Sequence, residues 1–139
     1  MNKLAENLKA NKLKVTPQRL AIYTYLMNTG SHPTVETIYN DLKDEFPTMS
    51  LATVYKTVAS LRDVNLVREF NVSEDSNRYD ADTSRHAHVI CKKCHNVYDY
   101  YGDVDIDKNI SELQELSNFK IDSFDVNFYG ICKNCQGED

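Results

Sequence analysis

The sequence predicts an α+β fold, in which an N-terminal winged helix-turn-helix domain is followed by a small α/β domain with a four-cysteine zinc site. Three observations predict this arrangement. Apolar residues recur at helical spacing through most of the first 70 residues. Two short strand-like runs follow them. All four cysteines lie after residue 85, in two C-x-x-C pairs.

The first long helix is predicted from its start signal. Thr16 is a suitable N-cap, and Pro17 suits the first helical position because its fixed φ angle matches the helix. The helix is expected to run to about Asn28, before Gly30. Its expected apolar face consists of Leu20, Tyr23 and Met27.

Two further helices are predicted from caps and spacing. Thr34 is expected to cap a helix that ends before Pro47, because the residue before proline avoids the helical region. Ser50 is expected to cap the third helix, residues 51–63. The apolar faces of these two helices are expected to hold Val35, Ile38 and Leu42, and Leu51, Val54, Val58 and Leu61.

Two short strands, within 66–72 and 77–81, are expected after the third helix and would complete a winged helix. In such folds the second helix of the helix-turn-helix enters the major groove of DNA. Here that helix is 50–62, and hydroxyl, small and basic side chains on its outward face suit base and phosphate contacts. The alternative is an ordinary solvated helix face. The expected outward residues are Ala52, Thr53, Lys56, Thr57 and Ser60, with Tyr55 near the edge.

Charge and polarity divide the chain into two modules. Residues 1–80 hold ten basic and ten acidic residues, whereas residues 81–139 hold six and eleven. The net charge of −5 alone argues against nucleic-acid binding, but a neutral module can bind DNA if its cations share one face. Residues 71–84 are polar and rich in turn formers. We therefore expect domains at 1–80 and 86–139, with a hinge at about 71–85.

The second module is expected to alternate strands and a helix. Residues 88–91 and 96–100 resemble strands on either side of the first C-x-x-C turn. A helix is expected from Ile106, with Ile110, Leu113 and Leu116 on one face. Residues 120–131 alternate and predict a half-buried strand, with Phe124, Val126 and Phe128 facing inward and Asp125 and Asn127 outward.

The two C-x-x-C pairs predict a structural zinc site. Cys91 and Cys94 form one pair, and Cys132 and Cys135 form the other. Two such turns that face each other complete a tetrahedral sulfur cage, which stabilises a module too small to be stable through burial alone. Alternatives are a redox dithiol, an iron–sulfur cluster and a c-type haem, since His95 completes a C-x-x-C-H pattern.

His86 and His88 are predicted to form part of a second metal site, since residues two apart in a strand share one face. Further ligand candidates are His32, Asp80, Asp82 and Asp99. Imidazole and carboxylate ligands suit Fe(II) or Mn(II), and can also accept zinc. A buried or surface histidine pair without a metal is the alternative, as is a non-haem iron enzyme.

The sequence contains no signal for a membrane or for export. No apolar run approaches the roughly 20 residues that a spanning helix needs. The first residues, MNKLAENLKANKLKV, show no apolar signal-peptide core. We expect a soluble, cytoplasmic protein without a membrane partner. In that compartment cysteines serve more often as metal ligands than as disulfides, and covalent haem attachment is disfavoured.

Several motifs together resemble the ferric uptake regulator (Fur) superfamily, and within it most closely the peroxide-sensing regulators of the PerR type. The resemblance spans essentially the whole chain. It lies in TPQR at 16–19, SHPTVETIYNDL at 31–42, SLATVYKTV at 50–58, RYD at 78–80, HAHVICKKC at 86–94 and YGICKNC at 129–135. It implies a homodimeric, metal-dependent repressor of operator DNA, not an enzyme, whose 86–139 module is a dimerisation and metal-binding domain.

Carried over residue by residue, the resemblance places structural Zn(2+) on Cys91, Cys94, Cys132 and Cys135. It places a regulatory Fe(2+) or Mn(2+) site on His32, Asp80, His86, His88 and Asp99. Contacts with double-stranded DNA are expected from Arg19, Ser50, Ala52, Thr53, Tyr55 and Lys56.

The subtype is predicted from three residue positions. Iron sensors commonly carry Glu at the position of Asp80 or Asp99, zinc sensors often carry Cys at that of Asp80, and iron sensors tend to have a further His in the late strand. This chain has Asp at both positions, 80 and 99, and no His in the late strand. These residues favour a peroxide sensor. Two residues depart from the peroxide-sensor pattern: Lys56 stands where Asn is frequent, and His95 where Gly is usual.

The subtype implies a mechanism for peroxide sensing. Fe(II) held by three His and two Asp would reduce hydrogen peroxide locally. His32 and His86 would be oxidised to 2-oxo-histidine, and DNA would be released. The Mn(II) form would repress without sensing peroxide. The alternative is an iron- or manganese-responsive Fur-type repressor that is not oxidised.

Overall fold

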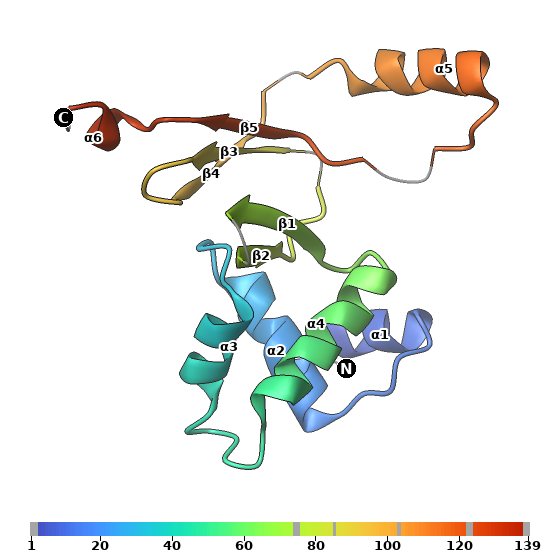
Figure 1. Cartoon of the computed structure of the whole chain (residues 1–139). Helices are drawn as coiled ribbons and strands as arrows, with labels where there is room; N and C mark the ends of the chain where they lie inside the picture. Colours follow the sequence, from blue (N-terminus) through green and yellow to red (C-terminus); the bar gives the residue numbers. More distant parts are fainter. Residues whose placement is uncertain (1–2, 74–75, 85, 103, 122–123, 138–139) are drawn as a thin grey trace. The chain divides into compact units, whose positions relative to one another are not determined.

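The computed structural model describes residues 3–73, 76–84, 86–102, 104–121 and 124–137. The chain divides into two compact units, Met1–Ser84 and Arg85–Asp139. The first unit contains four helices and a two-stranded sheet, and the second contains a three-stranded sheet with two helices, within the described residues (Figure 1). The mixed helix and sheet composition confirms the predicted α+β class.

Side-chain caps start three of the helices in the first unit. Thr16, Thr34 and Ser50 each accept a hydrogen bond from the backbone N–H three residues later, at 3.1, 3.2 and 3.1 Å. Such a cap satisfies a donor that the helix itself leaves free. All three predicted caps are confirmed. The helices are α1 (Lys3–Ala10), α2 (Pro17–Asn28), α3 (Val35–Leu42) and α4 (Leu51–Asp63).

The core of the first unit lies between these helices. Its fully buried side chains include Leu8, Ile22, Ile38, Val54 and Leu61. Each contributes about 1.5–3 kcal/mol relative to exposure. This core holds α2, α3 and α4 in the helix-turn-helix arrangement, in which α4 is the second helix.

The predicted apolar face of α2 is partly wrong. Met27 is 47% exposed, whereas Ile22 and Leu26 are buried beside Tyr23. Successive residues are about 100° apart around a helix, so a face centred on Leu26 cannot include Met27. The prediction followed the spacing from Leu20, which is itself only half-buried.

Two assignments on α4 also require correction. Leu51, predicted to be buried, is 38% exposed at the first turn of the helix. Thr57, predicted to face outward, is buried, because it lies next to Leu61 around the helix axis. Ala52, Tyr55 and Lys56 are exposed as expected.

Strands β1 (Arg68–Ser73) and β2 (Ser76–Asp80) form the wing, as an antiparallel pair with Arg68 opposite Asp80. Glu69 joins this wing to α4. Its carboxylate accepts hydrogen bonds from Arg62 Nη1 at 2.5 Å and from Asn77 Nδ2 and Tyr79 Oη at 3.0 Å each. The wing is therefore fixed to the end of α4 by one carboxylate.

The second unit is built on a sheet with the order β4-β3-β5. The central strand β3 (Ala87–Cys91) runs antiparallel to β4 (Val97–Tyr100) and parallel to β5 (Asn127–Gly130). Helix α5 (Ile106–Ser117) lies between β4 and β5 in the sequence, and the short α6 (Lys133–Gln136) follows β5. Ile90 and Cys91 are buried within this unit.

The late strand and α5 are less buried than predicted. Only 127–130 of the expected strand 120–131 is a strand, part of the remainder lies outside the described residues, and Phe128 is 48% exposed rather than inward. Leu113 and Leu116 on α5 are also exposed. The alternation of apolar and polar residues shows which side chains share a face of the strand, but not which face the rest of the protein covers. The second unit thus has exposed apolar side chains on α5 and β5.

None of the described helices is both long and apolar enough to cross a membrane.

Candidate metal centres and nucleic-acid interface

The four cysteines form one group in the second unit. Cys91 ends β3, Cys94 follows in the adjoining turn, Cys132 precedes α6 and Cys135 lies within it. Their four sulfur atoms all lie within 4.8 Å of one another. The Sγ atoms of Cys94 and Cys132 are 3.8 Å apart. A tetrahedral zinc ion with Zn–S bonds of about 2.3 Å has sulfur atoms about 3.8 Å apart, so the donor set and its spacing fit zinc.

Backbone donors prepare Cys91 to be a ligand. Its sulfur accepts hydrogen bonds from the N–H groups of Cys132 at 3.4 Å and Cys94 at 3.5 Å. These donors lower the pKa of Cys91 to about 5. The thiolate is the form that binds metal. Hydrogen bonding to Cys132 instead raises the pKa of Cys135 to about 12, so metal binding at the cluster must release protons.

His95 takes part in the turn rather than in the cysteine group. Its backbone has φ = 64°, the left-handed region, and its N–H donates to the carbonyl of Cys91 at 2.9 Å. The group that could hold a metal consists of four cysteines without this histidine. The second C-x-x-C pair therefore completes the site, which favours zinc over a c-type haem.

The first unit contains a buried histidine–aspartate pair. His32 Nε2 lies 3.4 Å from Asp80 Oδ2, and the two side chains are 5% and 10% exposed. The carbonyl of His32 accepts a hydrogen bond from Arg78 Nη1 at 3.1 Å. The next carbonyl, that of Pro33, accepts one from the N–H of Tyr79 at 3.1 Å. The wing strand β2 thus holds both members of the pair.

The second unit brings His86, His88 and Asp99 together. Both histidines are buried, and their rings lie 4.8 Å apart in an edge arrangement. Asp99 Oδ1 lies 3.4 Å from His86 Nε2 and 3.7 Å from His88 Nε2. Asp99 reaches both because it pairs with His88 across β3 and β4. This cluster supplies two imidazoles and one carboxylate, a donor set that suits Fe(II), Mn(II) or Zn(II).

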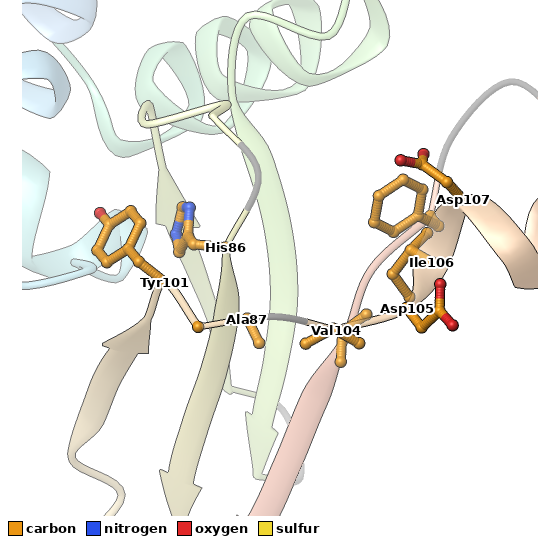
Figure 2. Close-up of a pocket in the computed structure, with 10 residues that line it drawn as sticks. His86, Ala87, Tyr101, Val104, Asp105, Ile106 and Asp107 are labelled. Atoms are coloured by element: carbon orange, nitrogen blue, oxygen red, sulfur yellow. The ribbon is translucent and has the colours of Figure 1, made fainter.

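His86 also borders a cavity of the second unit. Tyr101 stacks on its ring at 5.0 Å between centroids. Figure 2 shows the two rings side by side, with Val104, Asp105 and Asp107 at the far side of the cavity. The cavity measures about 570 Å³. His86 thus lines this cavity, although its own side chain is fully buried.

The five predicted regulatory ligands are thus grouped within their own units, two in the first and three in the second. Asp82, a further candidate, has another role. Its Oδ1 accepts hydrogen bonds from the N–H and hydroxyl of Ser84. The sequence did not predict the role of Tyr101, because no fixed sequence spacing marks a residue that stacks on a histidine ring.

The residues predicted to contact DNA differ in their exposure and in the hydrogen bonds that they already make within the first unit. Ala52, Tyr55 and Lys56 are exposed on α4. The hydroxyls of Ser50 and Thr53 lie 2.9 Å apart and belong to the helix cap. Arg19 Nη1 donates to the carbonyl of Lys14 at 2.6 Å. Glu36, which was not predicted, accepts a hydrogen bond from Tyr55 Oη at 3.0 Å.

Comparison with known proteins accounts for this combination of a winged helix, a four-cysteine group and histidine–aspartate groups. Residues 10–129 match the model of the ferric uptake regulator family. The chain belongs to the ferric uptake regulator family. Its members are metal-dependent, DNA-binding, dimeric transcriptional repressors and not enzymes. The four-cysteine group fits the structural zinc of such a protein, and the histidine–aspartate groups fit regulatory iron or manganese.

Relatives within the family include peroxide regulators. The peroxide-responsive repressor PerR of Staphylococcus epidermidis is 35% identical over 132 residues, which cover 95% of this chain and 87% of that protein. The peroxide stress regulator of Campylobacter jejuni is 34% identical with a TM-score of 0.73, covering 97% of this chain and 100% of that one. The Fur of Helicobacter pylori, described with three functional metal-binding sites, is 26% identical with a TM-score of 0.75, covering 96% and 89%.

Proposed function

We propose that this protein is a cytoplasmic, homodimeric repressor that binds operator DNA when Fe(II) or Mn(II) is bound and is released when hydrogen peroxide oxidises its ligand histidines. The family relation supports a metal-dependent repressor. The peroxide signal is supported by relatives such as the PerR of S. epidermidis. The observation that carries the proposal is the chemistry of the two histidine groups, in which every imidazole is paired with an aspartate.

The regulatory site is proposed to consist of His32 and Asp80 from the first unit with His86, His88 and Asp99 from the second. Each group is incomplete alone, since a pair or a trio leaves coordination positions open for Fe(II) or Mn(II). A metal that takes ligands from both units binds best when the units are in one particular arrangement. Its binding therefore favours that arrangement, and this difference in affinity is what allosteric control of DNA binding requires.

The DNA-binding role is proposed for α4 of the first unit. Its exposed residues Ala52, Tyr55 and Lys56 are suited to enter a major groove. Ser50, Thr53 and Arg19 are proposed to contact the DNA near its phosphate backbone. A single winged helix gives a modest interface. The apolar surface of the second unit, which includes Leu113, Leu116 and Phe128, is proposed to pair two copies so that two recognition helices are presented.

Peroxide sensing requires an oxidisable ligand that peroxide can reach. Bound Fe(II) supplies the reduction of hydrogen peroxide close to the imidazoles. In the net step one oxygen atom of peroxide is transferred to the C2 carbon of an imidazole and water leaves, which yields 2-oxo-histidine. The proposed targets are His86, which borders the cavity of about 570 Å³, and His32. An oxidised imidazole is a poorer ligand, so the metal site opens.

The other candidate function is an iron- or manganese-responsive repressor that uses the same ligands without being oxidised. The similarity to the Fur of H. pylori supports this second candidate. Peptide mapping by mass spectrometry after loading with Fe(II) and brief exposure to peroxide separates the two. Peroxide sensing predicts the added mass of one oxygen atom on the peptides that contain His32 or His86. An unmodified protein that still binds DNA would support the second candidate.

A further inference from the structure

Tyr55 on the recognition helix makes one defined polar contact within the first unit. Its side chain is 47% exposed, yet its hydroxyl donates to Glu36 Oε1 at 3.0 Å. The hydrogen bond to Glu36 raises the pKa of Tyr55, so the hydroxyl keeps its proton. The exposed aromatic residue of α4 therefore has a fixed polar partner that lies on another helix.

Glu36 is well placed to hold this bond. It lies in the first turn of α3, a helix whose start is fixed by the Thr34 cap. A carboxylate is favourable at that position because the helix dipole is positive there. Tyr55, on α4, borders a small polar cavity of about 70 Å³ with Glu36, Asn77 and Tyr79. The partner of Tyr55 is thus anchored to the same rigid body as the recognition helix.

This contact determines which hydrogen bonds Tyr55 can offer to DNA. A tyrosine hydroxyl has one proton to donate and lone pairs to accept with. Because its proton points to Glu36, only the lone pairs of Tyr55 are available. In the major groove the donors are the exocyclic amino groups of adenine and cytosine. Phosphate oxygens are acceptors, and the negative charge of Glu36 further disfavours them near Tyr55.

We propose that Glu36 is a positioning residue that commits Tyr55 to act as a hydrogen-bond acceptor, so that the pair selects a base with an exocyclic amino group at one operator position. The inference rests on the proposed role of α4 as the recognition helix. It goes further because it assigns a specificity function to Glu36, a residue of the preceding helix.

The test is sequence selection from a random duplex DNA library by the full-length, Mn(II)-loaded protein and its variants. At the position where Y55F reduces base preference, wild type is expected to favour adenine or cytosine. E36A frees the proton of Tyr55, so the preference there should fall about fivefold, which is the equivalent of one neutral hydrogen bond. E36Q should retain most of the preference, because its amide oxygen can still accept from Tyr55.

Two controls separate this effect from charge and folding. E45A removes a carboxylate from an exposed residue elsewhere in the first unit and should leave the base preference unchanged. The double variant E36A/Y55F should behave as Y55F alone, because the two residues act through one hydrogen bond. Thermal unfolding of each variant checks that α3 and α4 remain folded.

Three results would overturn the inference while leaving the repressor function intact. They are an unchanged preference in E36A, effects of E36A and Y55F at different operator positions, and additive effects in the double variant. A wild-type protein that selects no sequence with Mn(II) would instead contradict the proposed repressor function, and the inference with it.

Discussion

His32 and Asp80 lie 3.4 Å apart, nearly buried, although they are 48 positions apart in the sequence. The backbone of His32 has φ = 53°, a left-handed conformation that costs a non-glycine residue of order 1–2 kcal/mol. Hydrogen bonds from Arg78 and Tyr79 to the carbonyls of residues 32 and 33 hold it there. The wing therefore places a strained histidine beside an aspartate, and this pair is the first unit's part of the proposed regulatory site.

Replacing Asp80 tests whether this pair binds the regulatory metal. D80A should lower the affinity for Mn(II) by about tenfold or more, because one charged ligand is lost from the site. Isothermal titration calorimetry on the zinc-loaded protein measures this change. D44A, which removes an exposed carboxylate of the same unit, serves as the control and should bind as wild type. Equal affinity in D80A and D44A would remove Asp80 from the site.

The cysteine group predicts one zinc ion per chain. C94S and C135S should lose this zinc and unfold at lower temperature, because the metal contributes folding free energy to the small second unit. Elemental analysis together with thermal unfolding measures both effects. H95A should keep its zinc, since His95 lies in the turn and outside the group. Zinc that is retained in C94S but lost from H95A would reverse the assignment of ligands.

The carboxylate of Glu69 predicts a graded loss of stability. Y79F removes one of the three hydrogen bonds that this carboxylate accepts and should lower the free energy of unfolding by about 1 kcal/mol. E69A removes all three and should cost more. Urea unfolding measures the difference, with Y39F as a comparison for a half-buried tyrosine of the same unit. If Y79F were no less stable than Y39F, the hydrogen bond from Tyr79 to Glu69 within the wing would contribute nothing to stability.

Tyr25 predicts a dependence of stability on alkaline pH. Its pKa is raised from 10.0 to about 12, first by burial and then by its hydrogen bond to Asp41 at 2.5 Å. The folded state therefore holds a proton that the unfolded state releases, so the contribution is complete below pH 10 and is lost as the pH rises towards 12. The stability of wild type relative to Y25F should fall over this range. A constant difference would show that Tyr25 titrates equally in both states.

The sequence was sufficient for features that depend on local chemistry. The caps at Thr16, Thr34 and Ser50 could be predicted because a side-chain oxygen acts on a donor only three residues away. The C-x-x-C pairs could be predicted because each turn presents two sulfur atoms by itself. In both cases the partner lies within a few residues of the signal.

Other features depend on which surface the rest of the chain covers. The exposure of Met27 and the burial of Thr57 follow from the direction in which neighbouring helices pack, which periodicity alone does not give. The bonds of Glu69 with Tyr79 and of Glu36 with Tyr55 join residues 10 and 19 positions apart, without a spacing pattern to mark them. The predicted stripes of α5 and β5 were apolar, but the faces that they occupy are exposed.

The histidine ligands are proposed to turn a metal-dependent repressor into a peroxide sensor. The most direct measurement compares the Fe(II)-loaded and Mn(II)-loaded protein for binding to DNA selected by the Mn(II) form, before and after brief exposure to hydrogen peroxide. If the protein senses peroxide, the Fe(II) form loses DNA binding, fresh Mn(II) does not restore it, and the Mn(II) form is unaffected. Equal DNA binding by both forms after peroxide, with His32 and His86 unmodified, would show that the protein does not sense peroxide through these ligands.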